Sequence, residues 1–208
     1  MVPNSPNTEE LLLRARNGQA QAVDELLGQH REAVRRMIGL RLDPAIAARL
    51  DASDVVQDVL VEANRRLKDY LKDPSMPFHL WLRHIAKDHI IDAYRRHRGA
   101  QRRAVDREQA MQAPNLSDQS SVELAGRFVD QELTPASAAI KHELQQRLDA
   151  AIAEMPEDDR EVILMKHFEQ MSNQEIAAYY GLTEAAASMR YLRAIRRLKA
   201  KFSPDQSL

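Results

Sequence analysis

The stretch from residue 172 to residue 201, SNQEIAAYYGLTEAAASMRYLRAIRRLKAK, constrains the fold of this chain more than any other part. Ser172 is a favourable N-cap for a short helix over residues 173–180. Gly181 can adopt the left-handed backbone conformation that ends such a helix, and Thr183 can cap a second, longer helix. These signals predict two helices joined by a tight turn.

The second of these helices is strongly basic. No acidic residue occurs between Glu184 and Asp205, while basic residues accumulate. They are Arg190, Arg193, Arg196, Arg197, Lys199 and Lys201. A basic helix after a glycine turn is what insertion into a DNA major groove requires. A helical hairpin with a solvated basic face would give part of this pattern, but caps, glycine and one-sided charge together favour a DNA-binding helix-turn-helix.

The composition fits a helical protein and excludes several kinds of site. Of the 208 residues, 29% are charged and 5% are aromatic, and there is no cysteine. The chain therefore has no disulfide, no thiolate zinc site and no cysteine nucleophile. The net charge is only −1, but basic residues gather between residues 83 and 107 and in the last helix. This uneven distribution is more informative than the total charge.

The sequence shows no targeting or membrane-spanning pattern. Its first residues, MVPNSPNTEE, lack a basic start and an apolar run. No window approaches the roughly 18 apolar residues that a bilayer span needs. We therefore expect a cytoplasmic protein without membrane insertion.

Helical periodicity divides the chain into two blocks. Residues 1–104 and 140–203 carry apolar side chains at helical spacing, and alternating strand patterns are rare. In residues 105–139 the periodicity fades and proline, serine and glycine accumulate, although residues 122–133 could form a short helix. We predict an all-α fold of two small helical domains joined by a flexible linker, with the helix-turn-helix in the second domain.

Two helices of the first block are well delimited. A valine stripe over residues 55–59 marks the buried side of a helix that Ser53 caps. Residues 72–77 must form a loop, because two prolines three residues apart break any helix. The next helix is predicted over residues 78–98. Trp81 lies among leucines and isoleucines in this helix, so we assign it to the core and not to base stacking.

Both blocks, in this order, resemble bacterial RNA polymerase sigma factors of the extracytoplasmic-function (ECF) subfamily. In the first block the resemblance rests on DASDVVQDVLVEA (residues 51–63) and WLRHIAKDHIIDAYRRHR (residues 81–98). In the second it rests on LDAAIAEMPEDDREVILMKHFEQMSNQEIAAYYGLT (residues 148–183) and the basic helix that follows. The pairing, order and spacing of these motifs are far more specific than a helix-turn-helix alone.

The resemblance implies that the helix after residue 53 docks on the clamp-helix coiled coil of the largest subunit of core RNA polymerase. Four polar side chains share one face of this helix, opposite the valines. They are Asp54, Gln57, Asp58 and Glu62. An acidic, amide-bearing face can pair with basic residues of a partner. Isolated exposed charges usually bind nothing, but their position in the family motif favours docking.

The resemblance also assigns the loop 72–77 and the following helix to the opening of the minus-ten promoter element. Opening needs a place for an unstacked base and a basic track for phosphates. The expected DNA contacts are polar and basic residues of this segment. They are Lys72, Arg83, Lys87, His89, Asp92, Arg95, Arg96 and Arg98. Asp88 stands where many relatives carry Asn, which removes the amide from that position.

The second helix of the helix-turn-helix corresponds to the reader of the minus-35 element. Relatives often carry Val-Lys-Ser-Arg where this chain has Ala-Ser-Met-Arg at residues 187–190. The change removes a long hydrogen-bonding side chain, so we expect few base contacts and several phosphate contacts. The base contacts are expected from Ser188, Met189 and Arg190. The full predicted set is Thr183, Ser188, Met189, Arg190, Arg193, Arg196 and Arg197.

The sequence thus predicts a transcription initiation factor that binds core RNA polymerase, directs it to promoter DNA and helps melt it. The resemblance implies no cofactor and no catalysis, with an anti-sigma factor as a further partner. An enzyme is disfavoured, because the chain lacks a Gly-rich phosphate loop, HExxH and a serine elbow. A one-component regulator that binds duplex DNA without polymerase is the stronger alternative. The basic helix of the first block and the absence of dimerisation heptads argue against it.

Overall fold

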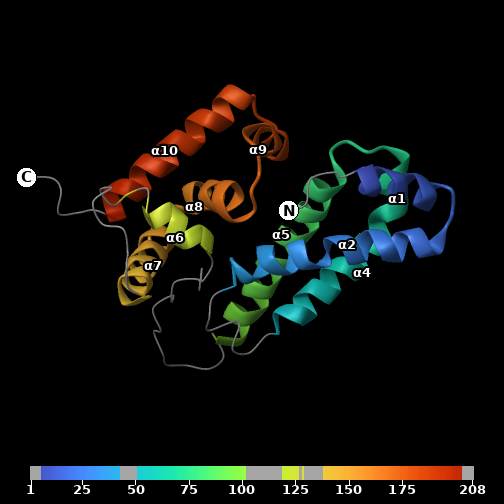
Figure 1. The fold of residues 1–208 in the computed structure, drawn as a ribbon. Coiled ribbons are helices and arrows are strands. Elements are labelled where there is room, and N and C mark those ends of the chain that lie inside the picture. The colour runs from blue at the N-terminus through green and yellow to red at the C-terminus, as the bar shows by residue number, and fades with distance from the viewer. Residues whose placement is uncertain (1–5, 43–50, 102–118, 127, 129–137, 203–208) are drawn as a thin grey trace, which may run out of the picture. The chain divides into compact units, whose positions relative to one another are not determined.

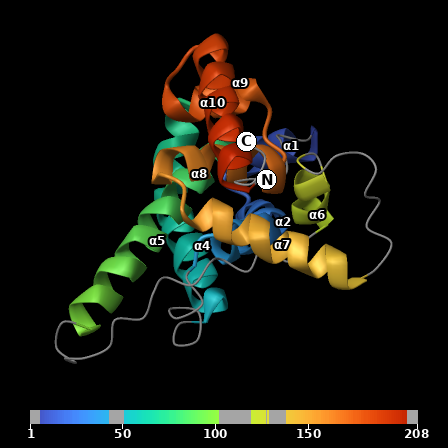
Figure 2. The same ribbon diagram turned by 90° about the vertical axis from the view of Figure 1, so that its left-hand side faces the viewer.

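The computed structural model describes residues 6–42, 51–101, 119–126, 128 and 138–202. These residues form helices and short connections, without a strand among them, which confirms the predicted all-α class. The chain divides into two compact units, Met1–Met111 and Gln112–Leu208. The elements of each unit are shown in Figures 1 and 2. Within the described residues, no helix is both long and apolar enough to cross a bilayer.

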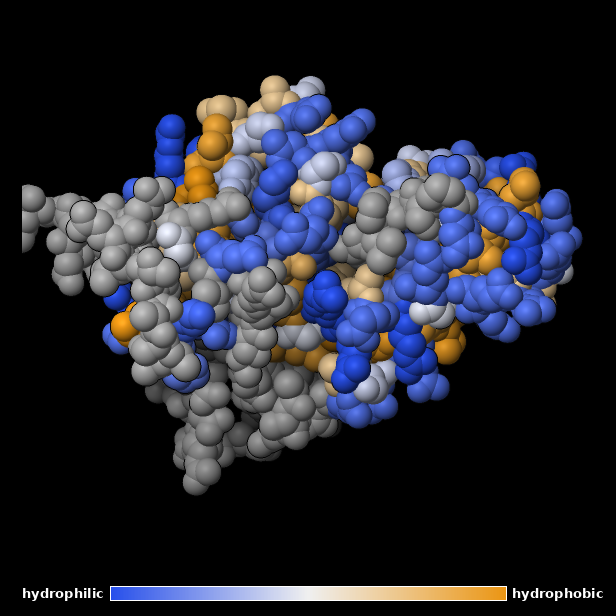
Figure 3. All heavy atoms as spheres, viewed as in Figure 1, coloured by the Kyte–Doolittle hydropathy of each residue, from blue (hydrophilic) through white to orange (hydrophobic). Residues whose placement is uncertain are grey.

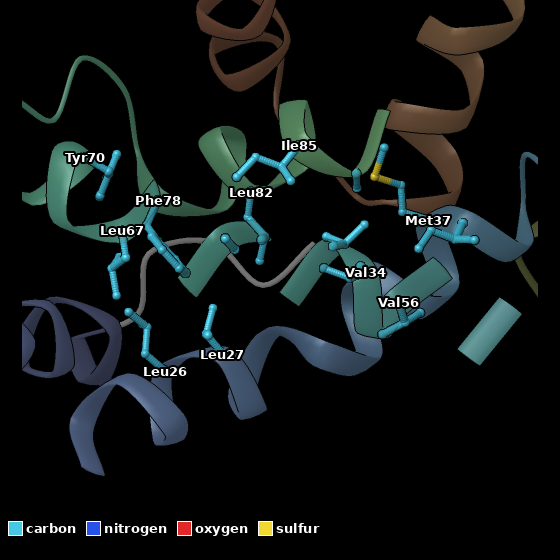
Figure 4. Close-up of a cluster of buried hydrophobic side chains, with 14 of the residues drawn as sticks. Leu26, Leu27, Val34, Met37, Val56, Leu67, Tyr70, Phe78, Leu82 and Ile85 are labelled. Carbon is cyan, nitrogen blue, oxygen red and sulfur yellow. The ribbon is translucent and has the colours of Figure 1, made fainter. Parts of the chain in front are cut away.

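The first unit is organised around α2, which packs against its neighbours α1, α4 and α5. The bounds are α1 (Pro6–Arg16), α2 (Ala20–Gly39), α4 (Ala52–Lys72) and α5 (Phe78–Gln101). Figure 4 shows buried side chains of three of these helices meeting in one core, among them Leu26 of α2, Leu67 of α4 and Leu82 of α5. All three are almost fully shielded from solvent.

The buried side of α4 carries the predicted valine stripe. Val55, Val56 and Val59 are buried, which leaves the opposite side of the helix to solvent. The N-cap differs from the prediction. Asp51 caps the helix by accepting a hydrogen bond from the Ser53 backbone N–H at 2.8 Å, so Ser53 lies inside the first turn.

The predicted loop between α4 and α5 is present, because α4 ends at Lys72 and α5 begins at Phe78. The Tyr70 hydroxyl donates a hydrogen bond to the Met76 carbonyl at 2.9 Å and so ties the loop to the end of α4. Trp81 is half-buried, with its ring centroid 4.7 Å from that of Tyr70 and 5.4 Å from that of Phe78. Its packing against the core agrees with the prediction.

The second unit contains the helix-turn-helix and the helices that support it. The bounds are α6 (Gln119–Gly126), α7 (Ala138–Ala153), α8 (Glu157–Ile163), α9 (Asn173–Tyr180) and α10 (Glu184–Phe202). A π-helical turn, η1 (Leu164–Phe168), continues α8 and buries Met165 and Phe168. Because α10 packs against α7, α8 and α9, its position is fixed by most of the unit.

Part of the predicted linker folds with the second unit. Helix α6 lies inside the range 105–139 and packs against α7 and η1. Leu124 and Ala125 are buried, and the Phe128 ring lies 5.6 Å from the Phe202 ring at the end of α10. The predicted linker was therefore too long over residues 119–128. Leu124, Ala125 and Phe128 stand at helical spacing there, but the run is too short to predict a helix without the partners that it meets in α7, η1 and α10.

Candidate nucleic-acid interface

The helix-turn-helix is built by the local signals that the sequence contains. The Ser172 hydroxyl accepts a hydrogen bond from the Glu175 N–H at 3.1 Å, and the Glu175 carboxylate accepts one from the Ser172 N–H at 2.8 Å. This capping box satisfies two donors at the start of α9. Gly181 ends α9 with φ 63° and ψ 35°, and the Thr183 hydroxyl accepts the Ala186 N–H at 3.2 Å. The predicted caps and turn are confirmed.

Side chains that hold α9 and α10 together include one predicted base reader. Ile176 of α9 and Ala187 of α10 are buried in the space between the helices. Beside them, the Asn173 amide donates a hydrogen bond to the Ser188 hydroxyl at 2.9 Å. Ser188 is half-buried and faces α9, so in this structure its hydroxyl joins the two helices and does not project outward.

Two further contacts orient α10. The His167 ring and the Tyr191 hydroxyl are hydrogen-bonded at 3.0 Å and link η1 to α10. The Arg190 guanidinium lies over the Tyr180 ring, 4.8 Å from its centroid, in cation–π geometry. Arg190, which we predicted to contact bases, is thus half-buried against α9.

The outward side of α10 carries the remaining predicted residues and one that the sequence did not single out. Thr183, Arg193, Arg196 and Met189 are exposed, with 54% of Met189 accessible. Leu192 is 42% exposed. Leu192 stands three positions after Met189 in the sequence, and this spacing places both side chains on the same side of the helix. Figure 3 shows tan and orange apolar side chains beside blue hydrophilic ones over α10.

Arg197 makes an ion pair that fixes α10 on α8. Its guanidinium donates to the carboxylate of Asp159, whose side chain is only 12% exposed. A hollow of about 210 Å³ lies beside this pair. Its lining residues are Pro156, Asp158, Asp159, Arg190, Arg193 and Arg197. The acidic residues offset part of the positive charge of α10 here, and Arg197 has a structural partner in addition to its predicted role at phosphates.

The prediction for Arg83 on α5 is wrong, because its side chain is fully buried. The helical phase explains this position. His79 and Ala86, four residues before and three after Arg83, are buried on the same side of α5. A charge at this phase faces the core of the first unit and not an exposed basic track.

The other predicted minus-ten residues with described side chains are exposed or half-buried, on α5 or at the end of α4. Arg95, Arg96 and Asp92 are exposed, while Lys87 and His89 are half-buried. Asp92 lies 3.6 Å from an Arg95 nitrogen, so it partly neutralises the basic end of the helix. The Lys72 ammonium donates to Asp69 at 3.0 Å. The side chain of Arg98 lies outside the described residues.

The exposed face of α4 forms a second surface. Asp54, Gln57 and Asp58 are exposed there, as predicted from the valine stripe. Glu62 differs, because its side chain is only 18% exposed and bonds Arg65 at 2.6 Å as well as Arg66.

The hydrogen bonds from Arg65, together with the charges of both arginines, lower the pKa of Glu62 from 4.5 to about 2. Its charge is thus already engaged within α4.

Val61 is 63% exposed on the same face as Asp54 and Gln57. Val61 was not among the predicted docking residues, although its position out of phase with the buried valines indicates an exposed side chain.

In the described part of the chain, no group of three or more His, Asp or Glu side chains is placed to hold a metal ion. Most of the predicted site residues with described side chains lie instead on exposed or half-buried parts of the helices.

Comparisons with known proteins relate these surfaces to a family. The Sigma-70 region 2 family matches residues 26–100, and the Sigma-70, region 4 family matches residues 145–198. RNA polymerase sigma factor CnrH of Cupriavidus metallidurans is 30% identical over 198 residues, which cover 94% of each chain. ECF RNA polymerase sigma factor SigD of Mycobacterium tuberculosis is 27% identical over 199 residues, 96% of this chain and 85% of SigD. The chain belongs to the ECF sigma factors.

The fold of this ECF sigma factor agrees with the assignment. It resembles the solved structure of CnrH in complex with the cytosolic domain of CnrY, with a TM-score of 0.60 and 26% identity. The likeness covers 96% of this chain and 99% of the CnrH chain. The ECF sigma factor is therefore a transcription initiation factor that acts with RNA polymerase, and the alternative of a polymerase-independent regulator is rejected.

Proposed function

We propose that three helix faces of this ECF sigma factor divide its work. The exposed face of α4 docks on the largest subunit of core polymerase, α5 contacts the minus-ten element, and α10 reads the minus-35 element. The observation that carries the proposal is the α9–α10 pair, whose capping box and left-handed Gly181 present an exposed, basic helix. A helix held in this way can enter a major groove without reorganising.

Docking through α4 rests on the exposed residues Asp54, Gln57, Asp58 and Val61. The two carboxylates can pair with basic residues of a partner helix, while Val61 supplies an apolar contact one turn further along the same face. Interfaces of this kind combine a small apolar centre with a charged surround. Glu62 is assigned a supporting role here, because its carboxylate is held by Arg65 and Arg66.

The test of this docking is charge reversal at two exposed positions. Asp54→Lys with Asp58→Lys should abolish capture of core polymerase, since each change turns an attraction into a repulsion. Asp24→Lys with Glu32→Lys is the matched control, because it makes the same change in charge on exposed positions of α2. Circular dichroism establishes that both variants are folded. Equal capture by the two folded variants would contradict the assignment of α4.

The minus-ten contact is assigned to the exposed end of α5. Arg95→Ala with Arg96→Ala should impair promoter opening more than polymerase binding, because these arginines lie after the loop and offer charge to a displaced strand. Permanganate reactivity of promoter thymines measures opening. Arg35→Ala with Arg36→Ala removes two exposed arginines of α2 and serves as the control. Normal reactivity in the α5 variant would refute the proposal.

The minus-35 contact is assigned to α10, with Arg193 and Arg196 on phosphates. Arg193→Ala should weaken promoter binding about equally for all upstream sequences. Promoter binding should also become less sensitive to salt, with the negative slope of log affinity against log salt concentration shallower by about one. Relaxed selectivity at one base position with unchanged overall affinity would instead make Arg193 a base reader.

The remaining expectations concern setting and regulation. We propose that the protein acts in the cytoplasm, where its polymerase is, and without a catalytic step or cofactor of its own. We also propose an anti-sigma factor as a partner, on the precedent of CnrH with the cytosolic domain of CnrY. Such a partner should be released from the chain by purified core polymerase. The Asp54→Lys, Asp58→Lys variant should block this release if it prevents polymerase docking.

A further inference from the structure

The outward side of α10 is apolar where a reading helix meets base edges. Ala185, Met189 and Leu192 follow one another at spacings of four and three residues, which places them on one side of the first turns. Ala185 is exposed, Met189 is 54% exposed and Leu192 is 42% exposed. In Figure 3, apolar side chains are visible over this helix.

Three polar side chains at the start of α10 are engaged within the second unit. The Ser188 hydroxyl accepts a hydrogen bond from Asn173, and the Thr183 hydroxyl accepts one from the Ala186 N–H. Arg190 lies over the Tyr180 ring. The side chains that project from the middle of the outward side are therefore those of Met189 and Leu192, which can only make apolar contacts.

Charge further along the helix indicates what covers this apolar strip. Arg193 and Arg196 are exposed immediately after it, and no acidic residue interrupts the helix between Glu184 and Phe202. Helix-turn-helix proteins place the first turns of the second helix at base edges and bind phosphates through flanking positive charge. An apolar strip followed by arginines is thus complementary to a DNA major groove.

We propose that Met189 and Leu192 read thymine, by packing against its C5-methyl group in the major groove. In the major groove the bases present hydrogen-bond donors, acceptors and, on thymine, this methyl group. The methyl is therefore the one base feature that apolar side chains can recognise. The inference rests on the proposed assignment of α10 to the upstream promoter element. It adds that the element contains thymine on the contacted strand, at one or two positions opposite Met189 and Leu192.

The size of the effect follows from burying one methyl group. Transfer of one such group from water is worth a factor of about four in affinity at 25 °C. Removing the methyl from a contacted thymine should therefore weaken holoenzyme binding about fourfold. Removing it from a thymine that α10 does not contact should leave the affinity unchanged.

The experiment uses the full chain in complex with core polymerase. The holoenzyme first selects promoters from a library that is randomised over the upstream element. Each thymine of the selected element is then replaced by deoxyuridine, which lacks only the C5-methyl, and binding is titrated. The same templates are titrated with Met189→Ala, Leu192→Ala and, as a control, Ile140→Ala, which truncates a 44% exposed apolar residue of α7.

The expected result is an approximately fourfold loss with deoxyuridine at one or two positions for wild type and Ile140→Ala. The loss should disappear at one of those positions in Met189→Ala or Leu192→Ala, because the contact is already gone. Selection of an element without A·T pairs would overturn the proposal, as would equal binding of every deoxyuridine template by wild type. Unchanged promoter binding by both α10 variants would instead mark the strip as a protein-binding surface.

These outcomes separate the inference from the function on which it rests. Failure of the holoenzyme to select any upstream sequence would refute the assignment of α10 to that element. Selection of an element whose recognition is insensitive to the thymine methyl would leave that assignment intact and refute only thymine reading.

Discussion

The ion pair between Arg197 and Asp159 gives the sharpest test of how α10 is held in place. We expect Arg197→Ala to destabilise the second unit, because it leaves the Asp159 carboxylate, only 12% exposed, without its guanidinium partner. A simple phosphate contact would predict no such effect. The variant therefore distinguishes a residue that positions the reading helix from one that only binds DNA.

The solvent exposure of the two side chains sets how much stability the second unit should lose in Arg197→Ala. Exposed ion pairs contribute about 0–1 kcal/mol, whereas breaking a fully buried pair costs about 3–5 kcal/mol. Here the acid is shielded, but the Arg197 side chain is 60% exposed, so water can partly replace the loss. We expect about 1–2 kcal/mol, which raises the open population of α8 and α10 roughly 5- to 30-fold.

Hydrogen exchange of the full chain, followed by mass spectrometry, measures this opening separately in each unit. Peptides from α8 and α10 should exchange faster in Arg197→Ala, while peptides from α4 should not change. Arg193→Ala is the matched control, since its exposed side chain should cost no more than about 0.5 kcal/mol. Adding Asp159→Asn to Arg197→Ala should recover part of the protection. Equal exchange in the Arg193 and Arg197 variants would refute the structural role.

Three further predictions concern the turn, the cap and pH. Gly181→Ala should destabilise the second unit by about 1 kcal/mol, because φ is 63° at this position. Gly28→Ala inside α2 should instead stabilise the first unit by about 0.5–1 kcal/mol, because a methyl group there meets no other atom. Urea denaturation should therefore show changes of opposite sign in the free energy of unfolding. Ser172→Ala should cost about 1 kcal/mol through loss of the capping box, measured as faster exchange in α9. Burial lowers the pKa of His30 from 6.5 to about 4. Between these two pH values the imidazole binds a proton in the unfolded chain but not in the folded one. The first unit should therefore lose stability as pH falls from 6.5 towards 4, seen in urea midpoints by Trp81 fluorescence, and His30→Gln should flatten this dependence.

The features that could be predicted from the sequence are those decided by neighbours along the chain. Ser172, Gly181 and Thr183 act on groups within a few residues, and the structure confirms all three. The loop after α4 depends on two prolines and is equally local. The valine stripe of α4 could also be predicted, because helical phase alone separates its buried from its exposed side.

The features that could not be predicted depend on contacts between distant residues. Arg83 carries a charge, but its phase on α5 directs it into the core. Ser188 and Arg197 belong to the predicted DNA-binding set, yet they meet Asn173 and Asp159 from other helices. No local signal contains these partners. The segment after Gln119 was misread for the same reason, because its anchor on α10 is Phe202.

The attachment of α6 to the second unit limits how far apart the two units can be. The covalent connection between them runs from Gln101, at the end of α5, to Gln119, at the start of α6. At about 3.3–3.6 Å per extended residue, the 18 steps between them measure at most about 65 Å. The same length corresponds to roughly 19 base pairs of B-form DNA at about 3.4 Å per pair. The peptide between α5 and α6 thus contributes its own upper limit to the promoter spacing that one molecule can tolerate, independent of the strength of either DNA contact.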